Sequence, residues 1–210
     1  MTASSAPIIH VADDDAHFLR SLLFMIEGLG FAAVGYPSAE AFAQADPAPV
    51  PQGCCLLLDI RMPRMSGLEL QRRLGATPCM PILFMTGHGD VDQAVQAMRG
   101  GALDFLQKPF KEQALFDALS AAVAASAEAQ RQLARMDEAR ALLARLSPRE
   151  RDVAHLVARG LSNKEVARRL DISDHTVHVH RQRITEKTGS GHAAGLARLI
   201  LRVDADALED

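Results

Sequence analysis

The chain is 210 residues long with a formal net charge of −3, and 48% of its residues are hydrophobic, which allows packed cores and excludes a globally disordered protein. It contains no tryptophan and one tyrosine, so its cores must be mainly aliphatic. No apolar run approaches the roughly 20 residues of a membrane helix, and residues 1–7 lack the basic-then-apolar order of a signal peptide, so we expect a soluble cytoplasmic protein that makes no membrane contact.

Five short apolar runs alternate with segments of helical period over the first 110 residues. The runs are Ile8–Ala12, Ala32–Tyr36, Cys54–Leu58, Ile82–Met85 and Leu103–Leu106. The alternation predicts an α/β fold, a doubly wound five-stranded parallel sheet with helices on both faces. In such sheets the functional site lies at the carboxyl ends of the strands.

Polar residues stand at these strand ends. Asp13 and Asp14 follow the first run, Asp59 and Thr86 follow the third and fourth, and Lys108 follows the fifth. Clustered carboxylates need a cation, and their oxygen atoms suit Mg²⁺. A carboxylate beside a metal ion and a lysine is well placed to accept a phosphoryl group. Asp59 is the best candidate nucleophile because it stands alone at a strand end.

The segments VADDDA, LLLDIRMPRMSGLEL, LFMTGHGD and DFLQKPF, in this order, resemble the receiver domain of two-component response regulators, most closely the FixJ-like branch, whose sheet is flavodoxin-like. We expect this domain over residues 6–125. The resemblance implies that Asp59 is phosphorylated, that Thr86 and Lys108 contact the phosphoryl group, and that Phe105 is a switch residue. It also implies a cis Lys108–Pro109 bond.

The same resemblance implies a set of Mg²⁺ ligands and two tuning positions. The ligands are Asp13, Asp14, Asp59 and the main-chain carbonyl of Arg61. The side chains of Arg61 and His88, each two residues past a site residue, occupy positions that tune the lifetime of the phosphate in this family.

Residues 112–146 contain no Pro or Gly and are rich in Ala, Gln, Arg and Glu, a composition that favours helix. We expect the last receiver helix to continue into a long helical linker, residues 126–146. Its apolar stripe breaks between Ala124 and Gln132, which leaves two interpretations open, a solvated spacer or a helix that dimerises or relays a signal.

A basic, all-helical unit follows. Residues 147–202 carry 11 Lys+Arg against 6 Asp+Glu, whereas residues 1–146 carry 12 against 16. Only the back of the chain is therefore expected to meet a polyanion. Ser147, Pro148 and Glu150 predict a capping box, and Ser162 and Ser173 cap helices expected over residues 163–170 and 174–187. A last helix is expected over residues 192–202. The helix expected over residues 174–187 carries the polar groups that reach into the major groove.

The pieces LSPRE, GLSNKEVA and TVHVHR resemble the LuxR-type helix-turn-helix DNA-binding domain, which we expect over residues 147–204. The resemblance places six residues near DNA: Lys164, Thr176, His178, His180, Arg181 and Lys187. Thr188 replaces the leucine or methionine usual in this family, which predicts a weaker last turn of the recognition helix. His175, His178 and His180 lack the spacing of a metal site, and a pH-sensitive contribution to DNA binding is the alternative.

Together these features predict a transcriptional regulator, not an enzyme, that accepts phosphate from a cognate sensor histidine kinase and binds promoter DNA. RNA polymerase is a further candidate partner. Phosphorylation is expected to act through homodimerisation, or through release of the DNA-binding domain. A phosphohydrolase with an aspartyl nucleophile is the alternative from another class, but it requires an acid where Arg61 stands. A receiver that never accepts phosphate is the other alternative, and the intact set of Asp59, Thr86 and Lys108 disfavours it.

Overall fold

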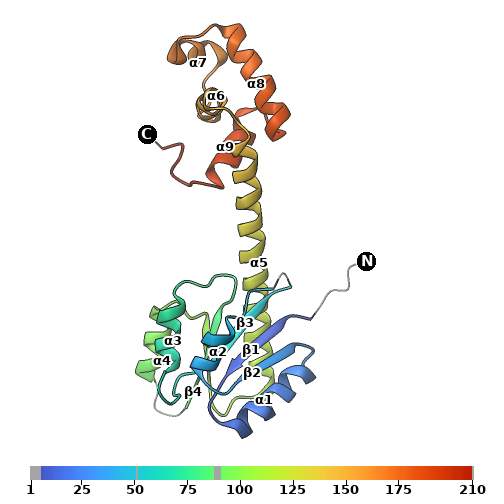
Figure 1. The fold of residues 1–210 in the computed structure, drawn as a ribbon, viewed down its shortest axis with the longest axis vertical. Coiled ribbons are helices and arrows are strands. Elements are labelled where there is room, and N and C mark those ends of the chain that lie inside the picture. Colours follow the sequence, from blue (N-terminus) through green and yellow to red (C-terminus); the bar gives the residue numbers. More distant parts are fainter. Residues whose placement is uncertain (1–5, 51, 88–90, 210) are drawn as a thin grey trace. The chain divides into compact units, whose positions relative to one another are not determined.

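The computed structural model describes residues 6–50, 52–87 and 91–209, which fold into two compact units, residues 1–131 and 132–210. Each unit has its own hydrophobic core, and Figure 1 shows a sheet in the first and only helices in the second. The helix α5 (Glu112–Ala144) begins in the first unit and ends in the second. In the described part of the chain no helix is long and apolar enough to cross a membrane. The predicted order of α/β unit, long helix and small helical unit is confirmed.

The sheet of the first unit contains five parallel strands in the order β2-β1-β3-β4-β5. They are β1 (Ile8–Ala12), β2 (Ala32–Tyr36), β3 (Cys54–Asp59), β4 (Ile82–Thr86) and β5 (Asp104–Gln107). The first two match the predicted ranges, and β3 and β4 extend one residue beyond their apolar runs to Asp59 and Thr86, which were expected at these strand ends. The fifth strand is shifted by one residue from the predicted run. Only Leu106 of this edge strand is buried, so apolar character marked its position poorly.

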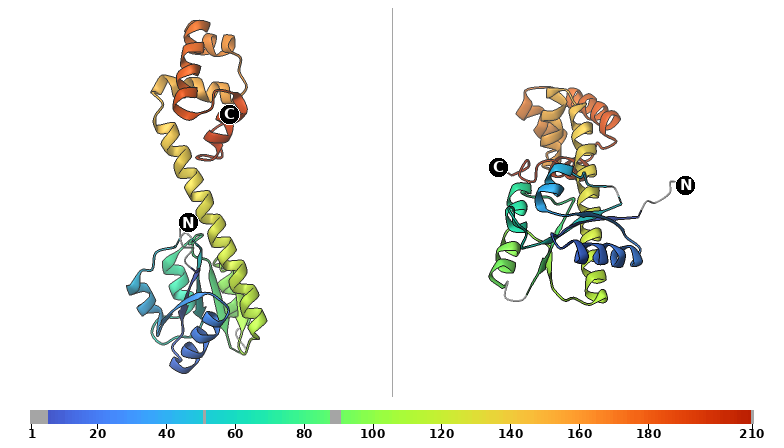
Figure 2. Two further views of the ribbon diagram at one scale, coloured as in Figure 1. Left: turned by 90° about the vertical axis from the view of Figure 1, so that its right-hand side faces the viewer. Right: turned by 60° about the horizontal axis from the view of Figure 1, so that its bottom comes forward.

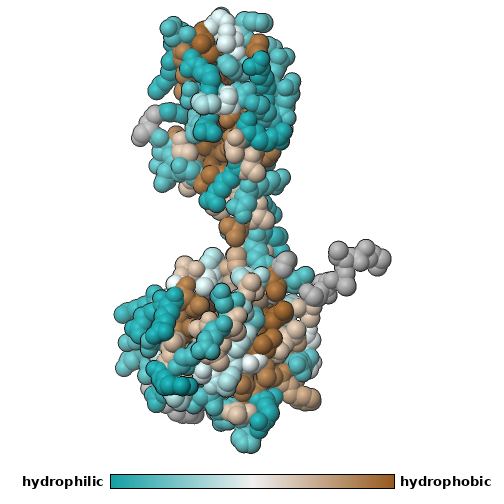
Figure 3. Space-filling view, in the orientation of Figure 1, coloured by the Kyte–Doolittle hydropathy of each residue, from teal (hydrophilic) through white to brown (hydrophobic). Residues whose placement is uncertain are grey.

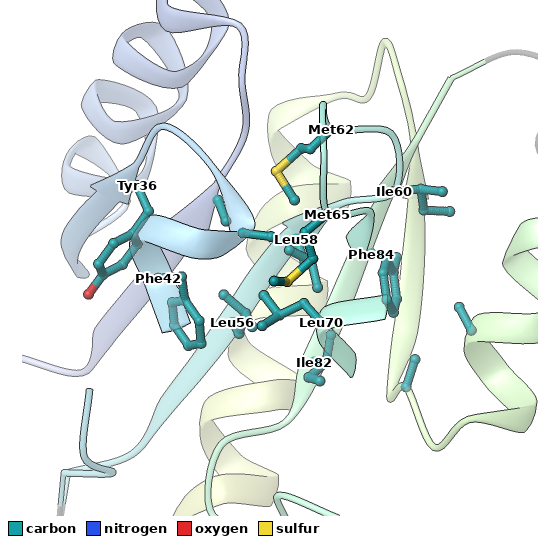
Figure 4. Close-up of a cluster of buried hydrophobic side chains, with 14 of the residues drawn as sticks. Tyr36, Phe42, Leu56, Leu58, Ile60, Met62, Met65, Leu70, Ile82 and Phe84 are labelled. Atoms are coloured by element: carbon teal, nitrogen blue, oxygen red, sulfur yellow. The ribbon is translucent and has the colours of Figure 1, made fainter. Parts of the chain in front are cut away.

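Helices cover both faces of the sheet (Figure 1). The α1 helix (Ala16–Gly28) and the first part of α5 pack on one face, while α2 (Ala39–Ala45), α3 (Gly67–Leu74) and α4 (Val91–Arg99) pack on the other. Alternate residues of β3 supply the two cores, Leu56 and Leu58 on the α2–α4 side and Cys55 and Leu57 on the α1–α5 side. Figure 4 shows Leu56 and Leu58 between Phe42, Leu70 and Phe84 in the first of these cores.

A buried serine seats α5 against the amino-terminal end of the sheet. Ser126 is fully buried, and its hydroxyl donates to the Cys79 carbonyl over 2.5 Å and accepts from the Cys54 N–H at 3.1 Å. Beside it, Gly53 has φ +98°, and a Cβ there would lie 2.8 Å from the Val123 carbonyl oxygen. The Ser126 hydroxyl thus links α5 to β3 and to the segment before β4, at the end of the sheet opposite the aspartates.

The second unit contains α6 (Pro148–Ala158), α7 (Asn163–Leu170), α8 (Asp174–Thr188) and α9 (Ala193–Leu201), drawn in orange to red in Figure 2. The predicted capping box of Ser147 and Glu150 is present, and Ser162 and Ser173 cap α7 and α8. Helix α6 packs against α8 and α9, and α7 packs against α8. The core between them includes Val153, Val157, Val166, Val177, Ile184 and Leu196, while hydrophilic side chains cover much of the face visible in Figure 3.

Candidate functional site

The ends of the strands bring three predicted residues into contact. Asp13 follows β1, Asp59 ends β3 and Lys108 follows β5. The register pairs Ala12 with Leu58, so Asp13 lies beside Asp59. The Lys108 ammonium donates to Asp13 Oδ2 over 2.7 Å and to Asp59 Oδ1 over 2.5 Å. The convergence that parallel strands predict is therefore present in the geometry.

These carboxylates are buried, which governs their electrostatics. Asp13 is 2% exposed and Asp59 is 8% exposed. Burial raises the pKa of Asp59 from its usual range, against the opposing effects of the Lys108 ammonium and the Arg61 N–H. The pKa of Lys108 is raised, because its bonds to Asp13 and Asp59 outweigh the effect of its burial. The ammonium also lies 4.2 Å from the centroid of the Phe18 ring.

Backbone groups hold the two aspartates in place. The Asp15 N–H donates to Asp13 Oδ1 over 2.9 Å, and the Arg61 N–H donates to Asp59 Oδ2 over 2.8 Å. Asp15 also caps α1 by accepting from two N–H groups of its first turn. At Gly67, the first residue of α3, a Cβ would lie 2.2 Å from the Asp59 carbonyl oxygen. The loop after Asp59 therefore requires glycine at this position.

The other predicted residues of this site lie around the contact. Thr86 is buried at the end of β4, and its carbonyl accepts from the Lys108 N–H at 2.7 Å. Asp14 and the side chain of Arg61 are exposed. Phe105 on β5 is 44% exposed and outside the buried core. The Lys108–Pro109 bond is cis, as expected, and His88 lies outside the described residues.

The residues present fit a divalent cation in charge and in chemistry. When both buried aspartates are ionised, one ammonium leaves the group with a net negative charge, and the exposed Asp14 adds to it. All of the candidate ligands are oxygen atoms, which suit Mg²⁺. Among the described residues no three acidic, histidine or cysteine side chains already converge as a cage. A cation here therefore requires a main-chain carbonyl and water to complete its coordination.

The six predicted DNA contacts fall into two groups. Lys164 and His178 are exposed, and Thr176 and His180 are partly buried on α8. The Thr176 hydroxyl lies 2.7 Å from the Ser173 hydroxyl, and Arg181 and Lys187 have partners on other elements of the second unit. Arg181 donates to Asn163 Oδ1 over 2.6 Å and to the Gly191 carbonyl over 2.8 Å, and Lys187 donates to Glu150 Oε2 over 2.6 Å.

Two features of this unit were not predicted from the sequence. Glu150 is buried, and the carboxylate that accepts from the Ser147 N–H in the predicted capping box also accepts from Lys187 on α8, a bond that the sequence did not predict. Thr188 is buried, and its hydroxyl donates to the Ile184 carbonyl at 2.7 Å and accepts from the Ser190 N–H at 3.2 Å. Helix α8 extends to Thr188 and ends at Gly189, which has φ +70°. The hydroxyl thus bonds backbone groups at the last turn of α8.

Comparisons with known proteins match both units. Residues 9–120 match the response regulator receiver domain, and residues 144–200 match the bacterial regulatory proteins of the luxR family. The chain is 42% identical to the transcriptional regulatory protein FixJ of Azorhizobium caulinodans over 92% of this chain and 91% of the relative. It is 40% identical to nodulation protein W of Bradyrhizobium diazoefficiens, over 94% and 86%.

Solved structures match over most of the chain as well. The response regulator StyR aligns with a TM-score of 0.78 at 38% identity and covers 93% of this chain and 98% of its own. Full-length FixJ from B. japonicum aligns with a TM-score of 0.58 at 39% identity, over 96% and 98%. The likeness therefore extends across both units and the helix that joins them.

Proposed function

The chain belongs to the FixJ-like response regulators, which join a receiver domain to a LuxR-type DNA-binding domain and regulate transcription in dependence on phosphorylation, and on this premise we propose that Asp59 is the residue that accepts the phosphoryl group. The supporting observation is the contact of Asp59 Oδ1 with the Lys108 ammonium at 2.5 Å, on a strand end beside the buried Asp13. An ammonium in this position is ready to pair with a phosphoryl oxygen.

The proposed transfer follows from the positions of these side chains. An oxygen of Asp59 attacks the phosphorus of a phosphohistidine on the kinase, a P–O bond forms, and the P–N bond breaks so that its electron pair returns to the imidazole. Lys108 stays between Asp13 and the new phosphoryl group and offsets their charge. Thr86, at the end of the adjacent strand, donates its hydroxyl to a phosphoryl oxygen.

Asp13, Asp14, Asp59 and the Arg61 carbonyl are the proposed holders of Mg²⁺, which supplies charge stabilisation to the transferring group when it is bound. Their oxygen-only chemistry and the negative charge of the site support this set. The pairing of a receiver with a DNA-binding domain implies a histidine kinase and promoter DNA as partners. RNA polymerase contact, a cytoplasmic location and the absence of turnover as an enzyme remain proposals.

We further propose that phosphorylation promotes a homodimer through the surface formed by α4, β5 and α5. Four large apolar side chains are exposed on α4, on β5 and at the residue before β5: Val95, Met98, Leu103 and Phe105. A surface of this kind on a monomer is typical of an interaction site. Phe105 is the proposed switch residue on the strength of the family resemblance, and it pairs with Phe84 on β4, two residues before Thr86. Release of the DNA-binding domain on phosphorylation is the alternative to dimerisation. The limits of the receiver domain, residues 6–125, of the linker, residues 126–146, and of the DNA-binding domain, residues 147–204, stay predictions.

The test of Asp59 is phosphorylation in solution. We expect the full chain, given Mg²⁺ and a small phosphodonor, to gain the mass of one phosphoryl group and to dimerise. Asp59→Asn should do neither, and Asp92→Asn, which removes an exposed acid on α4, should behave as the wild type in mass. An adduct on Asp59→Asn would reject the assignment. If the wild type shows no adduct, beryllium fluoride as a stable phosphoryl mimic separates rapid loss of phosphate from a receiver that never accepts it.

A further inference from the structure

A polar pocket of about 560 Å³ lies in the second unit where three helices meet. Asn163 lines it from the start of α7 and His192 from the residue before α9. Four residues line it from α8: His178, Arg181, Gln182 and Thr185. Their spacing of three, one and three positions places them on one face of the helix. The pocket therefore borders the helix that the family uses to reach DNA.

The lining is suited to an anion. The residues that line this pocket contribute one guanidinium, two imidazoles and no carboxylate. Arg181 fixes two of its walls through the bonds to Asn163 Oδ1 and to the Gly191 carbonyl. Because Oδ1 of Asn163 faces the guanidinium, its amide N–H groups point away from Arg181 and remain donors for an acceptor.

The start of α9 adds to this character. His192 is the N-cap of this nine-residue helix but makes no side-chain capping bond. The first N–H groups of a helix need an acceptor, and they carry the positive end of its dipole. A Cβ at Gly195 would lie 2.0 Å from Oγ of Ser190 and 2.9 Å from Cε1 of His192, so the imidazole lies close to the first turn of α9.

We propose that this pocket binds one phosphodiester group of the DNA backbone and that protonation of His178 and His192 increases its affinity. The inference rests on the proposed DNA-binding function and adds a defined site and a proton dependence to it. Imidazole is the side chain that changes charge between about pH 5 and pH 8. A protonated imidazole beside the phosphate adds a charge-assisted hydrogen bond that the neutral ring lacks.

The surrounding charges favour the phosphate as the partner of these histidines. On α8, Asp174 and His175 lie one turn before His178, and Arg181 lies one turn after it. Lys164 and Glu165 follow Asn163 on α7, and Glu165 Oε2 is bonded to both the N–H and the hydroxyl of Ser162. On α9 the nearest charged residue along the chain is Arg198. Asp174 is therefore the acid nearest to His178 along α8, and the other acid of this helix, Glu186, follows Thr185 at the far end of the pocket lining.

The test measures binding of the full chain, with Mg²⁺ and beryllium fluoride, to a fluorescein-labelled duplex of mixed sequence. A mixed-sequence duplex isolates contacts to phosphate. We expect Kd to fall several-fold between about pH 8 and about pH 6, and the slope of log K against log salt to steepen by about one. In the double variant His178→Gln and His192→Gln, which stays neutral throughout, most of this pH dependence should be lost.

His155→Gln is the matched control, since His155 lies on α6 outside the pocket. It should keep the pH dependence of the wild type. If the double variant keeps the pH dependence of binding, or if His155→Gln loses as much of it as the double variant does, the pocket is not the source of the pH dependence. The inference is then overturned, while DNA binding itself stands. If the wild type binds the duplex at neither pH, both the proposed DNA-binding function and the inference fail.

Discussion

The Lys108 ammonium donates to Asp59 Oδ1 over 2.5 Å, although 49 positions separate the two residues in the chain. The same ammonium donates to Asp13 Oδ2 at 2.7 Å. One cation thus offsets the repulsion between two buried carboxylates. A phosphoryl group or a metal ion that reaches Asp59 meets a side chain whose charge is already paired.

Lys108→Met should leave the two carboxylates without their shared cation. We expect the receiver to lose about 1–3 kcal/mol of unfolding free energy, because buried charged groups are left unsatisfied. Added Mg²⁺ should raise the melting temperature of this variant more than that of the wild type. Lys111→Met, which removes an exposed lysine three residues later, is the control. An unchanged melting temperature of Lys108→Met without Mg²⁺ would contradict the role given to the ammonium.

Ser126→Ala should loosen the seat of α5. The substitution leaves the buried Cys54 N–H without the acceptor that the hydroxyl provides, which costs about 1–3 kcal/mol. Hydrogen–deuterium exchange should increase in peptides that cover the start of β3 and the middle of α5. Ser120→Ala, at a half-buried position of the same helix, should have a smaller effect. Equal exchange in the two variants would show that the Ser126 bonds do not hold the helix.

Glu150→Gln should weaken the DNA-binding domain. The amide oxygen still accepts from the Ser147 N–H, but the charge that pairs with Lys187 is gone, which we expect to cost about 1–3 kcal/mol. Faster hydrogen–deuterium exchange in peptides from α6 and α8 of the full chain would show this loss of stability. Glu165→Gln alters the second capping box, whose glutamate is exposed, and should have the smaller effect. The reverse order would contradict the importance of the buried pair.

The same carboxylate predicts a pH dependence. The hydrogen bond from Lys187 lowers the pKa of Glu150 from its ordinary value of 4.5 to about 2. Because the folded-state pKa is the lower one, the stabilisation is fully present above about pH 4.5 and is lost as the pH falls through about 2. Glu150→Gln removes this titration, so the difference in stability between wild type and variant should shrink as the pH falls. A difference that stays constant with pH would contradict the assignment.

Arg64→Gly should stabilise the receiver slightly. Arg64 has φ +66°, a left-handed conformation that costs a residue with a side chain about 1–2 kcal/mol. Glycine removes that strain. Its greater conformational freedom in the unfolded chain, however, cancels about 0.5–1 kcal/mol of the gain in unfolding free energy. Thermal unfolding should show a small rise in melting temperature. Arg72→Gly on α3 is the matched change at a residue without a left-handed φ, and it should lower the melting temperature. An equal fall in melting temperature for Arg64→Gly would refute the backbone strain assigned to Arg64.

The sequence predicted the elements whose residues form clear patterns. β1 and β2 match residue for residue, because their apolar runs coincide with the strands. α2 was not predicted, since it has seven residues and buries only Ala39 and Phe42. Ser38, which caps it through the Ala41 N–H, was the available signal. Asp59 and Thr86 end β3 and β4, as their places after the third and fourth apolar runs predicted.

The site was predictable as far as topology determines it. Parallel strands bring their carboxyl ends together, so the meeting of Asp13, Asp59 and Lys108 followed from their places at strand ends. The pairs Lys187–Glu150 and Arg181–Asn163 did not follow, because 37 and 18 positions separate the partners and no local pattern links them. The bond between Ser126 and Cys54 spans 72 positions and was equally invisible.

The most direct test of the switch is the DNA affinity of the full chain before and after phosphorylation. Binding to a labelled mixed-sequence duplex would be measured with Mg²⁺, with and without a small phosphodonor, for the wild type and for Asp59→Asn. We expect the phosphodonor to tighten binding by the wild type, because paired DNA-binding domains act at a raised effective concentration, and to leave Asp59→Asn unchanged. Equal affinity of the phosphorylated and unphosphorylated wild type, or an equal response from Asp59→Asn, would contradict a switch at Asp59.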